Sequence, residues 1–199
     1  MASLEDEYYF IRRPDDDGLP LLRPDTDTYR RRYRNIPQPG TKPYFFENAL
    51  AEEQDLQNIP CPITPPDVLV GGADIIVKSH IRERLLDIEI PNLFMFPSVY
   101  IHNDDEWYED YWYLGFIKEF DVLDRNLSEY VSDGDNDDSV AVLKYVFDAD
   151  AMRKMTPKDR LLFKIGGTSF GWITCNQSLF PLFYGAGESG VWVQKVSEF

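Results

Sequence analysis

The chain has 199 residues, with 20 Lys and Arg against 35 Asp and Glu, which gives a net charge of −15 at pH 7. This length suits one domain, or one domain with an appended region. A hydrophobic share of 43% and an aromatic share of 15% exclude a wholly disordered chain. The acidic balance disfavours direct binding to nucleic acid or to an anionic membrane and favours a basic protein partner.

The expected location is the cytoplasm. No apolar run approaches the roughly 18 residues that a membrane span needs, and the first seven residues lack the basic and apolar stretches of a secretory signal. The two cysteines, Cys61 and Cys175, are too few for a disulfide framework, and we expect both to be reduced.

Residues 1–72 are predicted to form an N-terminal arm packed on a core domain of residues 73–199. A short strand is expected at residues 8–11, but the ten prolines between positions 14 and 66 exclude long regular elements. A basic run, Arg30-Arg31-Arg32-Tyr33-Arg34, stands out in this acidic chain. Because acids at positions 25 and 27 lie beside it, we expect these arginines to pair with the protein's own acidic surface.

The periodicity becomes regular after Gly72. Residues 74–77 predict a strand, and Ser79 is expected to cap a helix because its hydroxyl can accept a hydrogen bond from a free backbone N–H. Four residues are predicted to line one face of that helix: Ile81, Leu85, Leu86 and Ile88. A strand at residues 93–96 should end at Pro97, with residues 99–101 as a further short strand.

The second half of the chain predicts strands at residues 111–120 and 140–147, separated by an acidic loop at 133–138. Asp148 should cap a short helix that runs to Met155, and residues 160–165 should return as a strand.

A strand-helix-strand unit is predicted twice. A shift of 97 residues aligns Ile76 with Ile173 and Leu85 with Leu182. Pro181 requires the second helix to be short or to start late. The expected fold class is α+β: a mixed, mostly antiparallel sheet with short helices, this duplicated unit and an irregular N-terminal arm.

No catalytic, cofactor or metal site is predicted. The glycine pairs are not followed by the residues of a phosphate loop, and no nucleophile elbow is present. His102, Asp104 and Asp105 could be drawn as a metal site, but adjacent residues of an extended segment point to opposite sides and rarely converge on one ion. We therefore expect a protein that is not an enzyme.

The strongest functional signal is the acidic segment 103–138, which has 13 acids against Lys118 and Arg125, a net charge of −11. Near its start, carboxylates alternate with Trp and Tyr, a composition typical of surfaces that recognise a basic partner. The alternative is that the rings face the core while the acids face water. The candidate partner-binding residues are Asp104, Asp105, Glu106, Trp107, Tyr108, Glu109, Asp110, Asp133, Asp135 and Asp137.

Three segments resemble those of a known family: Asp74-Ile75-Ile76-Val77-Lys78-Ser79 before a short amphipathic helix, then residues 94–97, then Asp121-Val122-Leu123-Asp124-Arg125-Asn126-Leu127-Ser128-Glu129-Tyr130. They look like the bacterial polymorphic-toxin immunity proteins of type eleven, formerly the domain of unknown function 1629. The apolar strand at residues 161–164 and the final strand-helix-strand also match. The resemblance covers residues 70–199, and residues 8–13 of the arm.

The resemblance implies an immunity protein that binds a cognate toxin, often an effector of a type VI secretion system and often a nuclease. A basic toxin domain, such as a DNase, bound one to one at its active site would suit the charge of −15. Asp121, Asp124 and Ser128 are expected to cap turns. Two other hypotheses remain: an enzyme that reverses a toxin-made modification, using carboxylates near residues 121–138, and a generic acidic adaptor.

Overall fold

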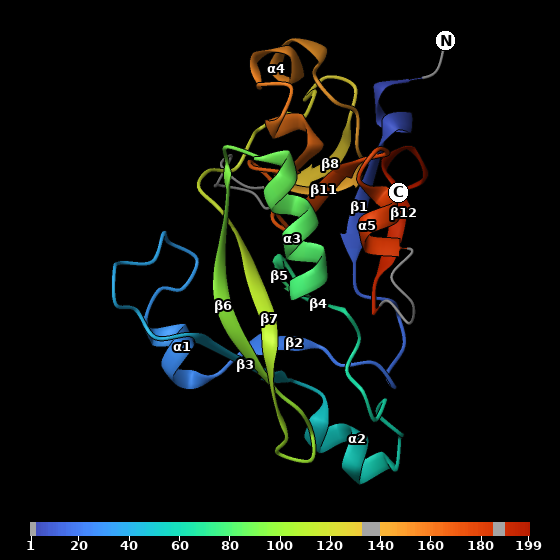
Figure 1. Ribbon diagram of the computed structural model, residues 1–199. Coiled ribbons are helices and arrows are strands. Elements are labelled where there is room, and N and C mark those ends of the chain that lie inside the picture. The colour runs from blue at the N-terminus through green and yellow to red at the C-terminus, as the bar shows by residue number, and fades with distance from the viewer. Residues whose placement is uncertain (1–2, 133–139, 185–189) are drawn as a thin grey trace.

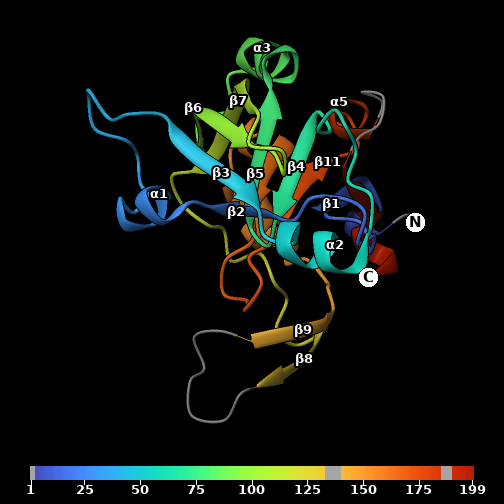
Figure 2. The ribbon, with the colours of Figure 1, turned by 90° about the horizontal axis from the view of Figure 1, so that it is seen from below.

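The structure is a computed structural model that describes residues 3–132, 140–184 and 190–199. Within these residues the strands form three sheets (Figure 1). The largest contains, in spatial order, β2 (Leu22–Pro24), β3 (Tyr44–Asn48), β6 (Leu93–Ile101), β7 (Trp107–Phe116), β5 (Asp74–Lys78) and β4 (Val68–Gly71). The second contains β10 (Leu162–Lys164), β11 (Ile173–Asn176), β1 (Tyr8–Arg12) and β12 (Trp192–Lys195). The third is the hairpin of β8 (Glu129–Ser132) and β9 (Val140–Lys144), which projects from the body (Figure 2).

The helices are short. The α-helices are α1 (Thr26–Arg30), α2 (Ala51–Gln57), α3 (Ser79–Ile88), α4 (Ala149–Lys154) and α5 (Phe180–Tyr184), and the 3-10 turns are η1 (Leu4–Glu7), η2 (Asp159–Leu161) and η3 (Val196–Glu198). All strand pairs are antiparallel except β3 with β6. The predicted α+β class is confirmed. No helix among the described residues is long and apolar enough to cross a bilayer.

Two four-stranded units share one topology. In the first, β4 and β5 pair, α3 follows, and β6 returns parallel to β5 with β7 between them. In the second, β10, β11, α5 and β12 repeat this order, with β1 between β11 and β12. The predicted duplication is therefore confirmed. The middle strand of the second unit, however, comes from the start of the chain.

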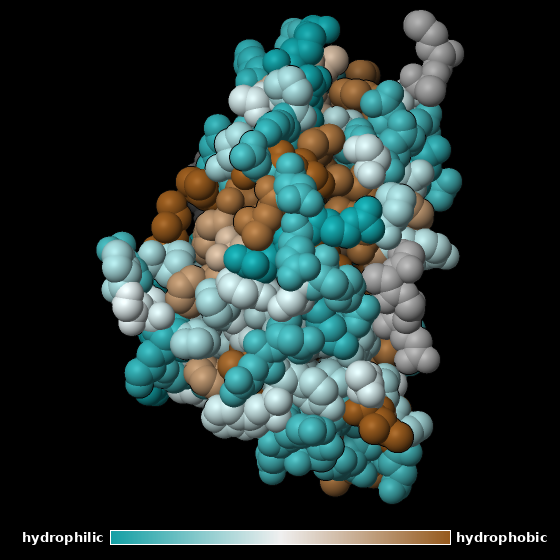
Figure 3. Space-filling view, in the orientation of Figure 1, coloured by the Kyte–Doolittle hydropathy of each residue, from teal (hydrophilic) through white to brown (hydrophobic). Residues whose placement is uncertain are grey.

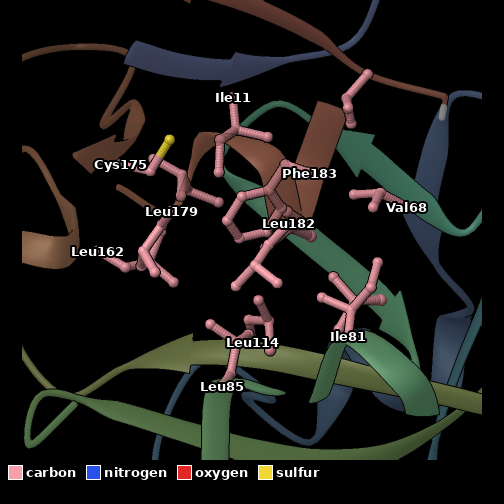
Figure 4. Close-up of a cluster of buried hydrophobic side chains, with 14 of the residues drawn as sticks. Ile11, Val68, Ile81, Leu85, Leu114, Leu162, Cys175, Leu179, Leu182 and Phe183 are labelled. Atoms are coloured by element: carbon pink, nitrogen blue, oxygen red, sulfur yellow. The ribbon is translucent and has the colours of Figure 1, made fainter. Parts of the chain in front are cut away.

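The two helices of these units meet in one apolar cluster between the two larger sheets (Figure 4). α3 contributes Ile81 and Leu85, and α5 contributes Leu182 and Phe183, all buried. Pro181 lies in the first turn of α5, where a missing N–H removes no helical hydrogen bond, so the short helix that it required is what forms. Truncating a core leucine of this kind to alanine costs about 2–5 kcal/mol.

Two predictions about α3 are wrong. Leu86 is 44% exposed, because it lies about 100° around the helix from Leu85 and so leaves the buried face. Figure 3 shows hydrophobic side chains gathered on this side of the molecule, over α3 and the adjoining end of β6 and β7.

Ser79 is the first helical residue rather than the cap, because its hydroxyl accepts a hydrogen bond from Trp112 Nε1 at 3.0 Å and donates one to the Asp110 carbonyl at 3.1 Å.

The structure also corrects the expected division at residue 72. Residues 1–72 supply β1 to the middle of one sheet and β2, β3 and β4 to the other. The boundary falls between two paired strands, where Val70 of β4 lies opposite Ile75 of β5. Prolines interrupt the N-terminal segment but leave room for these strands, which are only three to five residues long.

Candidate partner-binding site

The predicted acidic aromatic segment is the tip of the β6–β7 hairpin, at the lower end of the molecule in Figure 1. The turn is closed by the His102 N–H, which donates to the Glu106 carbonyl at 2.9 Å, and by the Asp105 N–H, which donates to the His102 carbonyl at 3.0 Å. Asp105 has a φ of 65°, a left-handed conformation that Asp tolerates better than most residues. The turn therefore presents Asp104, Asp105 and Glu106 to solvent.

Buried amides hold this tip in place. Asn48 Nδ2 donates to Gln54 Oε1 at 2.8 Å and to Asn103 Oδ1 at 3.0 Å, and Asn103 Nδ2 donates to Gln54 Oε1 at 2.8 Å. Asn48 and Gln54 are 3% and 2% exposed. Because Asn48 belongs to β3 and Gln54 to α2, the tip is fixed to two separate elements. A buried polar network whose members are satisfied makes the local structure rigid.

A β-bulge decides which rings face out. Ser98 lies opposite Tyr111 and Tyr100 opposite Tyr108, so one residue of β6 faces two residues of β7, Glu109 and Asp110. The extra residue puts Tyr108 on the same side as the buried Tyr111, packed against the same core cluster. Trp107 is left on the opposite side of the sheet.

Trp107 is 57% exposed, and its ring meets that of Phe45 edge to face, with centroids 5.5 Å apart. Tyr108 is more covered: its hydroxyl donates to Glu106 Oε2 at 3.0 Å, and its ring meets that of His102 at 90°. Tyr111 and Tyr113 are buried. The two interpretations of this segment therefore apply to different residues: Tyr111 and Tyr113 belong to the core, and Trp107 faces solvent.

The carboxylates around Trp107 are unpaired. Five acidic side chains at the tip of the hairpin are exposed: Asp104, Asp105, Glu106, Glu109 and Asp110. Within the described part of the chain, none of them forms an ion pair with a lysine, arginine or histidine. Their charges are therefore available to a basic group from outside the protein.

Asp133, Asp135 and Asp137 lie outside the described residues. The flanking strands β8 and β9 lie toward the opposite end of the molecule from the β6–β7 turn (Figures 1 and 2). We therefore restrict the candidate site to residues 104–110 together with Phe45.

The turn cap predicted at Asp124 is confirmed, whereas Ser128 does not cap a turn and binds the distant backbone of Val146. Asp124 Oδ1 accepts hydrogen bonds from the N–H groups of Asn126 and Leu127 at 2.9 and 3.1 Å. The Ser128 hydroxyl donates to the Val146 carbonyl at 3.1 Å and accepts from the Val146 N–H at 3.0 Å. No three His, Cys, Asp or Glu side chains of the described residues are grouped so that they could hold a metal ion.

Sequence reasoning missed Phe45 and the amides. The strand Tyr44–Asn48 buries every second residue, which leaves Phe45 and Glu47 on the other side. This pattern is only five residues long and follows several prolines, so it is a weak strand signal in the sequence. No sequence signal joins Asn48, Gln54 and Asn103, because only the pairing of β3 with β6 brings them together.

No model of a known protein family matches this sequence, and a search of curated proteins finds none that is significantly similar.

Proposed function

We propose that this chain is an immunity protein that binds a cognate basic toxin domain, a nuclease delivered by a type VI secretion system, and occludes its active site. One observation carries the proposal: an exposed Trp107 on a rigid turn, surrounded by carboxylates without ion-pair partners. The resemblance of residues 70–199 to immunity proteins of type eleven supplies the biological class.

The two kinds of side chain contribute differently to binding. Exposed carboxylates steer a basic partner and raise the association rate, while each rim charge adds only about 0–1 kcal/mol. A tryptophan that becomes buried on binding contributes about 2 kcal/mol or more. Phe45 contacts the ring of Trp107 from one side, which restricts the side chain before a partner covers it.

The test is binding of the toxin domain encoded in the adjacent open reading frame. Isothermal titration should give one toxin domain per chain, and toxin activity should fall to zero at one equivalent. Trp107→Ala should raise the dissociation rate at least tenfold, whereas Asp104→Asn and Glu109→Gln should mainly lower the association rate at low salt.

Trp192→Ala is the matched control, because Trp192 is 45% exposed on a different sheet. It should leave toxin binding unchanged. Absence of binding at micromolar concentrations would refute the immunity function. Equal dissociation rates for folded Trp107→Ala and the parent would refute the assigned surface, and complete protection at far less than one equivalent would favour the enzyme hypothesis.

A further inference from the structure

The loop that follows α1 projects from the edge of the six-stranded sheet (Figures 1 and 2). A basic groove runs along this loop. It consists of three adjoining hollows of about 460, 330 and 350 Å³, and Asn35 lines all three. The cationic side chains that line them are Arg30, Arg31, Arg32, Arg34, Lys118 and Lys164. The one acidic residue that lines them is Glu119, which pairs with Lys164 at 2.6 Å.

The arginines of this groove fall into two groups. Arg31 is held by the protein itself: its guanidinium donates to the carbonyls of Lys42 and Pro43 at 2.9 and 3.1 Å and pairs with Asp27 at 3.3 Å. Arg30 and Arg32 are exposed, and no carboxylate of the described residues pairs with either. The expected pairing with the protein's own acids is therefore confirmed for Arg31 and for Arg34, which pairs with Asp74, and within the described part of the chain it is not found for Arg30 and Arg32.

Two of the side chains that line the 460 Å³ hollow, Tyr33 and Arg34, are held in place by hydrogen bonds to Asp74. Arg34 donates to Asp74 through Nε at 3.1 Å and Nη2 at 2.7 Å, yet 59% of its side chain stays exposed. The Tyr33 hydroxyl donates to the same carboxylate at 2.6 Å. Between them and α1, Arg32 has a φ of 53°, a left-handed conformation that is costly for arginine. Residues in such conformations persist only where the surrounding structure enforces them, and they cluster at functional sites.

We propose that this groove binds a nucleoside di- or triphosphate. An arginine guanidinium can donate two parallel hydrogen bonds to a phosphate. Arg30 and Arg32 line one hollow of nucleotide size, and Arg34, whose Nε and Nη2 are bound to Asp74, lines the same hollow. Tyr29 lines the same hollow, is 70% exposed, and offers a ring face to a base. Lys118 extends the positive lining into the 330 Å³ hollow, where Lys164 is paired with Glu119.

The charge of the whole protein selects a short ligand. A long nucleic acid would carry its phosphates past the groove and onto a surface whose net charge is −15. A di- or triphosphate ends within the groove. The site is assembled from α1, its following loop, the start of the segment after β7 and the end of β10, which explains why no phosphate-binding motif marks it in the sequence.

Titration of the full chain with ATP, without added metal, tests the proposal. We expect saturable one-to-one binding that weakens at least tenfold in Arg30→Gln/Arg32→Asn, where asparagine is chosen because it tolerates the left-handed position. Arg84→Gln/Arg153→Gln removes two exposed arginines elsewhere and should bind ATP as the parent does. Tyr29→Ala should weaken ATP binding but leave the binding of tripolyphosphate unchanged.

No ATP binding at millimolar concentration would overturn the proposal, as would equal losses in the two double variants. Tighter, Arg30- and Arg32-dependent binding of a ten-nucleotide single-stranded DNA than of ATP would replace the short ligand by a nucleic acid. Melting temperatures of the double variants within a few degrees of the parent exclude unfolding as the cause. None of these measurements involves the toxin, so the outcome does not depend on the immunity function.

Discussion

Asp74 shows how a charged residue is kept inside this protein. It is 4% exposed, and its carboxylate accepts hydrogen bonds from the hydroxyls of Tyr33 and Tyr113 and from the Arg34 guanidinium. A buried charge is tolerated only when donors of this kind replace its water. Asp74 thereby joins the loop after α1 to β5 and β7, far apart in sequence.

The hydrogen bonds that Asp74 accepts stabilise the folded protein. Tyr113→Phe removes a 3.1 Å hydrogen bond to the buried carboxylate, and we expect it to lower the free energy of unfolding by about 1.5–3 kcal/mol, the range for bonds to charged groups. Urea denaturation measures the change. Tyr29→Phe removes an exposed hydroxyl and should change the free energy by less than about 0.5 kcal/mol. Equal midpoints for the two variants would show that Asp74 does not need the Tyr113 hydroxyl.

At the scale of single elements, the sequence predicted those whose signals are local. β1, β5, α4 with its Asp148 cap and β10 all lie where the pattern placed them, to within two residues at most ends. The cap of α4 is made by Asp148 Oδ1, which accepts from the N–H groups of Asp150 and Ala151 at 2.7 and 3.1 Å. Side-chain caps of this kind need only neighbouring residues, so sequence alone identifies them.

Elements that depend on a distant partner were predicted poorly. Pro97 was expected to end a strand, but β6 continues through it to Ile101. The reason is that β3 pairs with β6 only from Ser98 onward, so at Pro97 one edge of β6 is free and the missing N–H is tolerated. The bulge that turns Trp107 outward depends equally on the pairing of β6 with β7, and no single-strand periodicity reveals it.

The tip of the β6–β7 hairpin should lose rigidity when its amide support is removed. Asn103→Ala deletes two hydrogen bonds, to Asn48 and to Gln54, while those two residues remain bonded to each other. We expect a loss of about 1 kcal/mol in the free energy of unfolding and faster amide hydrogen exchange at residues 102–106. Asn126→Ala, at an exposed turn position, should leave that exchange unchanged. Unaltered exchange in Asn103→Ala would mean that the turn supports itself.

At the scale of the whole molecule, the aromatic residues decide the response to alkali. Burial raises the pKa of eight tyrosines, among them Tyr145, whose pKa rises to about 12. In the unfolded chain tyrosines ionise near pH 10. Because the neutral form is favoured in the folded state, these residues add stability below pH 10, and that stability is lost as the pH rises above 10.

Tyrosine ionisation can be followed by the absorbance of tyrosinate at 295 nm. At pH 11 this absorbance should be much lower for the native protein than for the same chain unfolded in guanidinium chloride. Circular dichroism at the same pH confirms that the protein is still folded. Equal absorbance of the folded and unfolded chains would contradict the burial of these rings.

The placement of β1 has a consequence for how the protein is made. A ribosome releases the chain from its N-terminal side, so β1 emerges long before its partners, since Tyr8 pairs with Asn176 and Ile11 with Val193. The unit of β4, β5, α3, β6 and β7 has all its parts within residues 68–116 and can form while synthesis continues. The sheet around β1 must wait until its partners, within residues 173–195, have been synthesised. During that interval Phe10 and Ile11, which are fully buried in the finished protein, remain uncovered on the nascent chain, and this is the stage at which the cell's folding machinery has most to protect.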